Sequence, residues 1–443
     1  MPDATRPRKP ETDRDATLTG MRYRLDERPP LRELIVFGLQ WLAVSVPSIV
    51  IIGRVIGSLQ CPGPSGETLY LQKISFVTGV TLLAQLAVGH RLPLVVGPSS
   101  VLLVGLLASL TCSLQAVYSA ILLGGAALTA AALTGVFGRL RKLFSPRVVA
   151  VVLLLVAFTL LPTILKLIAG PAEGASAPQR LLFASGLVLA TFAAGRYLRG
   201  MWGAVLVLLA TVTGSFAYAG LFGVAGLAAE QRTWLSGFFT DMTLPLTIEW
   251  GVLFSFMVCF VGLAVNDLGS IQSLQELLRP DAMERRIGHG IMVTGMGNVL
   301  AGLMGTLGPV NYSLSPGVIL SSGCGSRHAL IPAGVVLVVI AFSPVLMGVV
   351  GLIPAAVIGS VLFYILCYQV AVGLMTVART QTLDQVTGLV VGLPVLAGTM
   401  AAFMPAEAIA SLPAVVWPLA GNGFVVGIVF AFILEHGVFR GKH

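Results

Sequence analysis

Two broken stretches decide the fold: Arg91-Leu-Pro-Leu-Val-Val-Gly-Pro-Ser-Ser100 in the first half of the chain and Gly308-Pro-Val-Asn-Tyr-Ser-Leu-Ser-Pro-Gly317 in the second. Proline lacks a backbone N–H and glycine weakens helices, so neither stretch is predicted to be a continuous helix. Each is predicted to be extended, over 94–100 and 309–315, and to lead into a short helix. In a membrane, such backbone occurs only where it lines a cavity or is buried in protein.

The surroundings of both stretches indicate a membrane protein. Hydrophobic residues make up 56% of the 443 residues. Charged residues make up only 10%, whereas a soluble domain carries about 25%. Continuous apolar runs of about 20 residues recur from Leu34 onward, which predicts helices and not a barrel. The fold class is therefore an all-α polytopic membrane protein and not an enzyme, with fourteen spans at 33–57, 68–90, 92–111, 115–138, 147–169, 180–196, 201–224, 247–274, 286–306, 308–322, 328–349, 351–374, 382–404 and 413–437.

The order of these spans predicts an inverted repeat. The longest polar interruption, Ala228 to Leu246, divides the chain into two halves of seven spans. Because seven is odd, the second half must run opposite to the first. The broken stretches fall in spans three and ten, the third span of each half. A matched pair of interrupted segments is the best sequence pointer to a transporter's binding site, so we expect two short strands facing each other near the midplane.

The distribution of basic residues predicts the orientation. With the N-terminus inside, only five of the 27 lysines and arginines face outward: Arg54, Lys73, Lys166, Arg180 and Arg232. Cytoplasmic loops carry the excess of Lys and Arg, so both termini are expected to be cytoplasmic, with residues 1–32 as a tail. The formal net charge of +8 then reflects the membrane, and no nucleic-acid partner is expected. Without a Cys-x-x-Cys pair or a Walker-type loop, no metal, ATP or other cofactor is predicted.

Several stretches, in this order and spacing, resemble one known family. They are Phe37-Gly-Leu-Gln-Trp41, Gly89-His-Arg-Leu-Pro93, Glu249-Trp250, the region from Gly302 to Gly317, and Asn422-Gly-Phe-Val-Val-Gly-Ile-Val. Together they resemble the nucleobase–ascorbate transporters, the family of bacterial uracil and xanthine permeases. The resemblance covers almost everything after residue 20.

The resemblance implies an architecture and a function. It implies a core domain (33–138 and 247–349), a gate domain (147–224 and 351–437), and a substrate held between the strands of spans three and ten. The implied activity is proton-coupled uptake of a nucleobase, uracil-like or xanthine-like, or of a related heterocycle across the bacterial cytoplasmic membrane, by a homodimer. The alternative is an anion transporter of the sulfate-permease type, which shares this architecture; the N-termini of the short helices would suit an anion.

The positions that read the substrate in this family are changed here. The family's span-eight glutamate corresponds to Asn266, and the Glu or Gln and the Asn of span ten correspond to Leu314 and Ser315. The usual Gln-His of span one is Gln40-Trp41. The resemblance therefore implies the scaffold, and leaves the substrate open.

Asp267 is the candidate for proton coupling. An acid within a span costs roughly 2.5–3.5 kcal/mol on insertion scales and usually faces a cavity or a partner. Alternatively, Asp267 lies at the inner end of its helix and meets water. Asn266 offers a donor and an acceptor to a base-like edge, or it packs between helices. The whole predicted site comprises Gln40, Trp41, Ser99, Ser100, Leu102, Asn266, Asp267, Ser270, Ser313, Leu314 and Ser315.

For the remaining polar residues a structural or a functional role is open. The serines could hold a polar ligand or cap the half-helices. Gln40 is expected to be structural, and Trp41 either stacks on a planar substrate or packs. His90 and His328 each lie beside an arginine and are expected to be solvated. Lys73 is expected to extend its side chain so that its charged end lies at the membrane interface.

Overall fold

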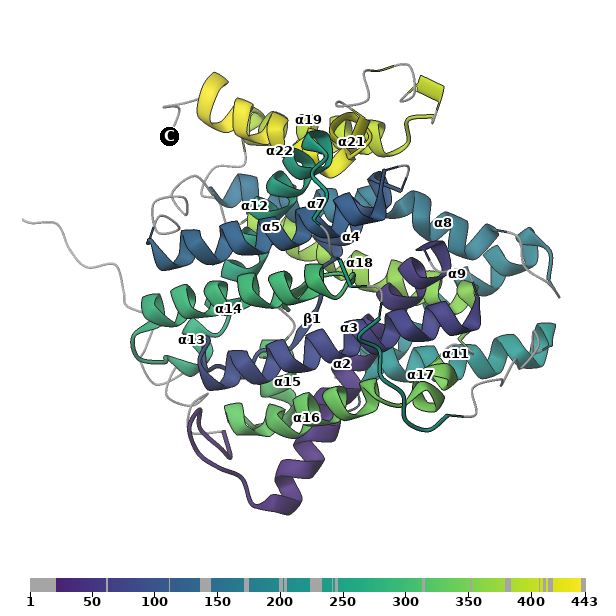
Figure 1. Cartoon of the computed structure of the whole chain (residues 1–443), viewed down its shortest axis with the longest axis vertical. Coiled ribbons are helices and arrows are strands. Elements are labelled where there is room, and N and C mark those ends of the chain that lie inside the picture. Colours follow the sequence, from purple (N-terminus) through teal and green to yellow (C-terminus); the bar gives the residue numbers. More distant parts are fainter. Residues whose placement is uncertain are drawn as a thin grey trace, which may run out of the picture.

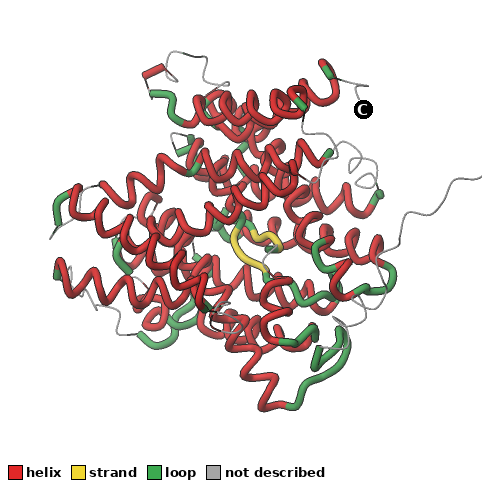
Figure 2. The backbone as a smooth tube through the Cα atoms, turned by 180° about the vertical axis from the view of Figure 1, so that it is seen from behind, coloured by secondary structure: helices red, strands yellow, loops and turns green. Residues whose placement is uncertain are grey.

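The described part of the protein is almost entirely helical, with one pair of short strands at its centre (Figures 1 and 2). The computed structural model describes residues 21–60, 63–110, 112–135, 145–170, 175–198, 202, 205–223, 233–240, 242–243, 246–312, 315–350, 353–378, 384–405, 407–408, 412 and 417–439. Eight of the described helices are long and apolar enough to cross a membrane, and three shorter apolar helices accompany them. This is the composition expected of a polytopic membrane protein.

The strands lie where the sequence is broken. β1 (Val96–Pro98) leads into α4 (Ser100–Ala108), and β2 (Pro309–Asn311) leads into α15 (Ser315–Ser322). The strands pair antiparallel, with Val96 opposite Asn311 and Pro98 opposite Pro309. The prediction of facing strands is confirmed, although the extended backbone is shorter than expected because helices already begin at Ser100 and Ser315.

Backbone hydrogen bonds at both ends of the strand pair complete this ladder. Pro98 and Pro309 have no N–H to exchange. Instead the N–H of Ser99 donates to the carbonyl of Gly308 at 2.9 Å, and the N–H of Tyr312 donates to the carbonyl of Val95 at 2.8 Å. Both strands are buried along their whole length. The non-helical backbone is thus enclosed by protein, as a membrane interior requires.

The element order around each strand is the same in the two halves. The first half begins with α2 (Leu31–Gln60) and α3 (Pro64–Ala87), then β1 with α4, then α5 (Leu114–Leu133). The second begins with α12 (Trp250–Gln272), the one-turn α13 (Gln275–Leu278) and α14 (Met283–Leu303), then β2 with α15, then η2 (Arg327–Leu330) and α16 (Ile331–Ala341). α5 packs along α14, and α3 packs along α16.

Glycines allow the closest of these contacts. A Cβ on Gly125 of α5 would lie 2.7 Å from the carbonyl oxygen of Gly295 on α14. Small residues of this kind let membrane helices approach backbone to backbone. The strands are therefore held inside a tightly packed group of helices.

A second group of helices packs beside the first. It contains α7 (Pro146–Thr159), α8 (Leu161–Ala169), α9 (Ala177–Tyr197), α11 (Leu206–Phe222), α18 (Ala355–Ala378), α19 (Gln385–Ala402), α21 (Trp417–Ala420), α22 (Gly423–Phe432) and the π-helical turn η3 (Ile433–Val438). α18 contacts α7, α8, α9 and α11, and α19 contacts α7 and α22.

Two predicted spans differ from the helices observed, and a third contains a break. The span at 147–169 corresponds to the membrane-length stretch Pro146–Ala169, which is divided at Leu160 into α7 and α8, with Pro162 in the first turn of α8. The span at 328–349 is likewise divided into α16 and α17 (Pro344–Val350), since Pro344 begins a new helix. In the span at 413–437, α22 begins only at Gly423, after its cap Asn422.

Candidate substrate and proton site

Asp267 lies at the centre of the helical packing. It is on α12 and its exposed fraction is 0%. The interpretation that Asp267 merely meets water at a helix end is therefore wrong. A buried carboxylate needs hydrogen-bond partners or a counter-charge, because leaving it bare in a low-dielectric interior is very costly.

Three donors supply the partners of Asp267. The Thr294 hydroxyl on α14 donates to Oδ2 at 2.8 Å. On β2, the backbone N–H and the side-chain Nδ2 of Asn311 both donate to Oδ1, at 3.0 Å and 2.7 Å. Hydrogen bonds to a charged group contribute about 1.5–3 kcal/mol each. Asp267 therefore fixes the position of β2 against α12 and α14.

The network continues from Thr294 and Asn311 to α3 and the loop after it. Gln85 of α3 donates to the Thr294 hydroxyl at 3.0 Å. The side-chain oxygen of Asn311 lies 3.0 Å from Nε2 of His90. Nδ1 of His90 accepts the backbone N–H of Leu92 at 2.9 Å, so Nδ1 carries no proton and Nε2 is the donor to Asn311. His90 is thus held as the neutral Nε2–H tautomer.

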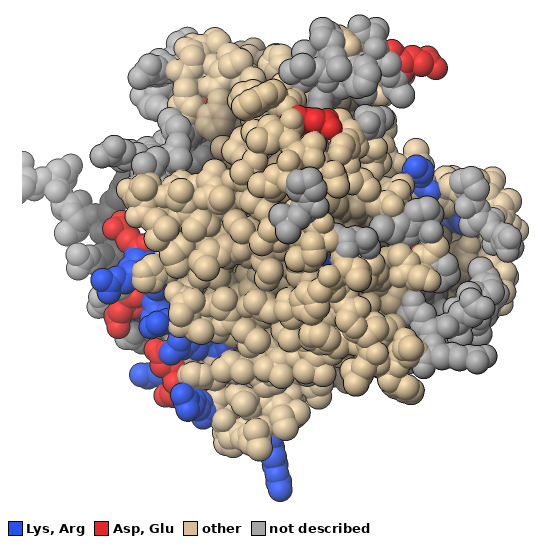
Figure 3. All heavy atoms as spheres, viewed as in Figure 1, with Lys and Arg blue, Asp and Glu red and all other residues tan. Residues whose placement is uncertain are grey.

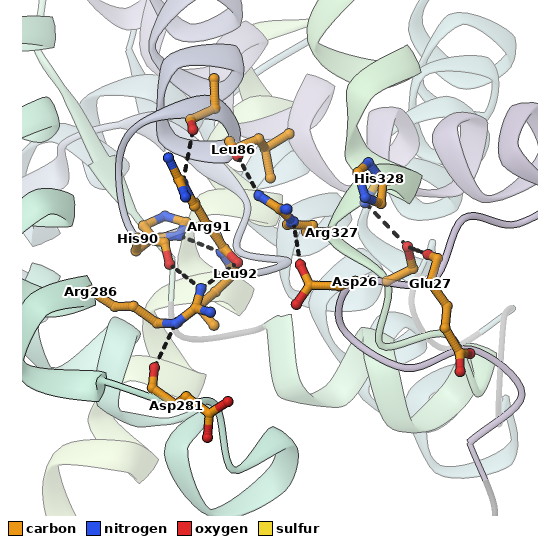
Figure 4. A network of polar contacts seen from close by, with 12 residues as sticks. Asp26, Glu27, Leu86, His90, Arg91, Leu92, Asp281, Arg286, Arg327 and His328 are labelled. Carbon is orange, nitrogen blue, oxygen red and sulfur yellow. Dashed lines mark hydrogen bonds and ion pairs between the residues drawn. The ribbon is translucent and has the colours of Figure 1, made fainter.

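One end of this network reaches a charged surface. Arg286 donates to the backbone carbonyls of His90 and Arg91 at 3.0 Å and 3.1 Å, and Arg327 donates to the carbonyl of Leu86 at 3.2 Å (Figure 4). Arg327 also forms an ion pair with Asp26 at 2.8 Å. We call the surface carrying Arg91, Arg286 and Arg327 the basic face. In Figure 3, charged side chains gather along one edge of the molecule.

Three of the predicted serines lie beside the strands, and their hydroxyls make hydrogen bonds to the protein backbone. Ser270 donates to the carbonyl of Asn311 at 2.8 Å. Ser315 accepts the N–H of Val95, just before β1, at 3.0 Å. Ser99 caps α4 by accepting the N–H of Leu102 at 3.3 Å. The capping interpretation therefore applies to Ser99.

The other predicted residues occupy different environments. Ser100 is the first residue of α4 and half-buried, and Leu102 is fully buried. Asn266 is half-buried, and its side chain makes no hydrogen bond to another described residue. Ser313 and Leu314 lie outside the described residues.

The two α2 candidates are buried. Trp41 is 1% exposed and therefore packs inside the protein. Gln40 is 6% exposed, and its Nε2 has no hydrogen-bond partner in the described part of the chain. Ser48 of α2, about two helical turns further along, forms a side-chain hydrogen bond with Tyr312, the residue after β2. The structure therefore brings Asp267, Ser270 and Ser315 to the strands through hydrogen bonds. Within the described residues, no hydrogen bond joins the side chain of Gln40 or Trp41 to either strand.

Sequence reasoning missed several partners and misplaced two residues. His90 was expected to be solvated beside Arg91, but His90 is fully buried while Arg91 is exposed. The chain turns at Arg91, whose φ is 54°; its neighbours His90 and Leu92 are both fully buried, and the Arg91 side chain is exposed. Lys73 is 4% exposed, so its side chain is enclosed by protein and does not extend from the surface. Asn311 could have been suspected from its place in the broken stretch; Thr294 and Gln85 carry no such signal.

The site has no metal-binding character in the part of the chain that is described. Within it, no group of three or more His, Cys, Asp or Glu side chains could hold a metal ion. Donors already surround Asp267, so its oxygens are not presented as open ligands. The hydrogen bonds around Asp267 suit a carboxyl group that gains and loses a proton at this position.

The fold is a group of apolar helices with two short strands at its centre, and a buried acid, Asp267, is hydrogen-bonded to one of these strands. This arrangement is that of a membrane transporter. Residues 32–407 match the Permease family of xanthine and uracil permeases, and the chain belongs to this family. It is 24% identical to the uric acid permease PucK of Bacillus subtilis, over 93% of this chain and 96% of PucK. It is 25% identical to the xanthine permease XanP of Escherichia coli, over 93% of each chain.

A solved structure shares the fold. The transmembrane domain of the cyanobacterial bicarbonate transporter BicA superposes with a TM-score of 0.62, over 84% of this chain and 97% of that domain. The two sequences are 19% identical, so the likeness concerns the fold alone. It is the fold of transporters with two inverted repeats of seven spans.

Proposed function

We propose that this protein is a proton-coupled symporter that carries a nucleobase of the uracil or xanthine type, or a related heterocycle, into the bacterial cell. The observation that carries the proposal is Asp267, a fully buried acid on α12 bound to strand β2. Ionisable residues inside membrane proteins are costly and mark ion or substrate pathways. Relatives that are uric acid and xanthine permeases support a purine-like substrate.

The same proposal includes fourteen spans, a core domain (33–138 and 247–349) and a gate domain (147–224 and 351–437). The packing of α5 on α14 and of α3 on α16 supports the core, and the contacts of α18 with α7, α8 and α9 support the gate. Transport then consists of movement of the core, with the strands, against the gate. A homodimer is the expected assembly.

Asn266 is the residue that we propose forms hydrogen bonds to the polar edge of the substrate. Its amide lies one residue from Asp267 and makes no hydrogen bond to the described protein, so it is free to bind a ligand. We expect Asn266→Ala to weaken substrate binding by about 1–3 kcal/mol, because a polar group of the substrate loses its partner. Titration of purified protein with radiolabelled xanthine, uric acid and uracil measures the change.

The matched control is Gln275→Ala, which removes an exposed amide on α13. Its affinity should equal that of the wild type. Equal affinity of Asn266→Ala and the wild type for every bound ligand would assign Asn266 a structural role instead.

Thermal-shift titration with a mixed panel separates the two substrate classes. The panel contains uracil, xanthine, uric acid, sulfate and bicarbonate. Stabilisation by a heterocycle, with none by either anion, is the expected result, since a ligand that binds only the folded state raises its stability. Stabilisation by sulfate or bicarbonate alone would favour the anion transporter.

Both termini are proposed to be cytoplasmic. The excess of Lys and Arg on one side predicts this orientation. A fluorescent reporter fused after His443 should therefore fluoresce, whereas an alkaline phosphatase fused after residue 173, in the loop between α8 and α9, should be active. The opposite pattern would reverse the predicted orientation. If both points lay on the same side of the membrane, the predicted number of spans would be wrong.

A further inference from the structure

Each strand of the site is held by one titratable side chain. The carboxylate of Asp267 accepts the N–H of Asn311 on β2. The imidazole of His90 accepts the N–H of Leu92, in the segment that leads into β1. The amide of Asn311 joins the two, because its Nδ2 donates to Asp267 and its Oδ1 faces Nε2 of His90.

We propose that His90 is a second proton-linked residue of this transporter, and that Asn311 is the positioning residue through which His90 and Asp267 respond to protons as one unit. The inference rests on the proton coupling proposed above and names the residues that carry it out.

A proton on His90 would break the hydrogen bond that holds the segment leading into β1. In the observed tautomer the Nδ1 lone pair is the acceptor for the Leu92 N–H. A proton from water added at Nδ1 occupies that lone pair, and both ring nitrogens then donate. The Leu92 N–H is left without its acceptor in a buried position, which favours a different arrangement of residues 91–95.

A proton on Asp267 would act in the same way on β2. Oδ1 accepts two donors from Asn311, and Oδ2 accepts one from Thr294. Protonation removes the charge that strengthens these bonds and turns one oxygen into a donor. Since Asn311 then holds its amide less firmly, the partner of the His90 ring changes too, and this links the two titrations.

The charges around His90 are few and lie mostly toward the basic face. Arg286 of α14 donates to the carbonyl of His90, and Arg327 donates to the carbonyl of Leu86 nearby. Arg91 follows His90 in the same loop, and its side chain donates to the carbonyl of Ala87. Asp26 and Asp281 lie near Arg286. On the buried side, the described charged group nearest in the network is Asp267, beyond Asn311, while Gln85 of α3 is neutral.

Hydrogen–deuterium exchange of the purified protein measures this response without any substrate. Exchange of peptides containing Leu92 or Asn311 is followed between about pH 4 and about pH 8, because a buried histidine takes up its proton only at more acid pH than a free one. The exchange is corrected for intrinsic rates. In the wild type, the corrected exchange of both segments should rise toward acid pH, by up to about tenfold per pH unit, the slope for one bound proton. A wild-type profile that is flat in both segments overturns the proposal.

Variants assign the response. His90→Asn keeps an acceptor near the Nδ1 position, and His90→Gln keeps a donor toward Asn311; neither can bind a proton. Both variants should give a flat profile for the Leu92 segment. The test therefore needs only one of the two to be soluble and monodisperse. His328→Asn, at the half-buried histidine beside Arg327, is the control and should keep the wild-type profile. A wild-type profile in both His90 variants would exclude His90.

A further variant tests the link through Asn311. Asp267→Asn should abolish the response of the Asn311 segment and shift the midpoint of the Leu92 response. An unshifted midpoint would show that the two residues titrate independently. Proton-driven uptake of radiolabelled xanthine, uric acid and uracil into proteoliposomes is measured separately. An acid-dependent exchange profile without proton-driven uptake of any of the three would leave the response of His90 and Asp267 to protons standing and overturn the proposed function; a flat profile with proton-driven uptake would do the reverse.

Discussion

Asp267→Asn is expected to abolish uphill uptake while leaving substrate binding largely intact. The asparagine side chain has nearly the same shape and can still accept the N–H of Asn311, but it cannot take up or release a proton. Without that proton, the gradient has no means to drive the cycle. We expect accumulation to fall to the equilibrium level, with the affinity changed by less than about tenfold, or about 1.4 kcal/mol.

Proteoliposomes with an imposed pH gradient measure this effect. The control is Asp281→Asn, which neutralises an exposed acid beside Arg286 at the basic face and should accumulate substrate like the wild type. Exchange of labelled for unlabelled substrate in Asp267→Asn should persist. If that variant still concentrates substrate when the gradient is applied, Asp267 does not carry the coupled proton.

Gly97→Ala is expected to abolish both binding and uptake. A Cβ on Gly97 would lie 2.5 Å from the hydroxyl oxygen and Cζ of Tyr312, whose ring lies against β1 and whose hydroxyl donates to the carbonyl of Pro98 at 2.8 Å. Overpacking of a filled interior costs typically about 1–3 kcal/mol. Here the displaced group is the ring of Tyr312, which follows β2, so either the ring leaves its place against β1 and loses its hydrogen bond to Pro98, or the two strands move apart.

Binding of labelled xanthine and the thermal midpoint of the purified protein report the two parts of this effect. The control is Gly186→Ala on α9, where an added Cβ meets no atom within 4 Å. Gly186→Ala should match the wild type in both measurements. Wild-type binding by Gly97→Ala would mean that the strand pairing can shift without consequence for the site.

The broken segments could be predicted because their signal is local. Pro98 and Pro309 cannot donate to a helix, and their glycine and serine neighbours favour turns and caps. The repeat of this pattern in both halves then gave the pairing of the two strands. The exact start of each short helix could not be predicted, because Ser99 caps α4 only in its observed conformation.

The network around Asp267 could be predicted only in part. An acid inside an apolar helix is unfavourable in a membrane and therefore rare, so Asp267 can be identified from the sequence. Its partners Thr294 and Gln85 look like ordinary polar residues of apolar helices, and only the packing of α3, α12 and α14 brings them together. His90 was misassigned because a buried ring and an exposed guanidinium occupy adjacent positions, and the turn at Arg91 separates them.

Uptake by wild-type proteoliposomes under three conditions tests the proton-coupled transport of a heterocycle most directly. Labelled xanthine, uric acid and uracil are offered with an inward proton gradient, with an inward sodium gradient and with no gradient. We predict that at least one of these heterocycles accumulates above its equilibrium level only when the proton gradient is present. Equal uptake under all three conditions, or accumulation driven by sodium, would contradict proton coupling; no uptake of any heterocycle, with gradient-driven uptake of sulfate or bicarbonate, would contradict the substrate class.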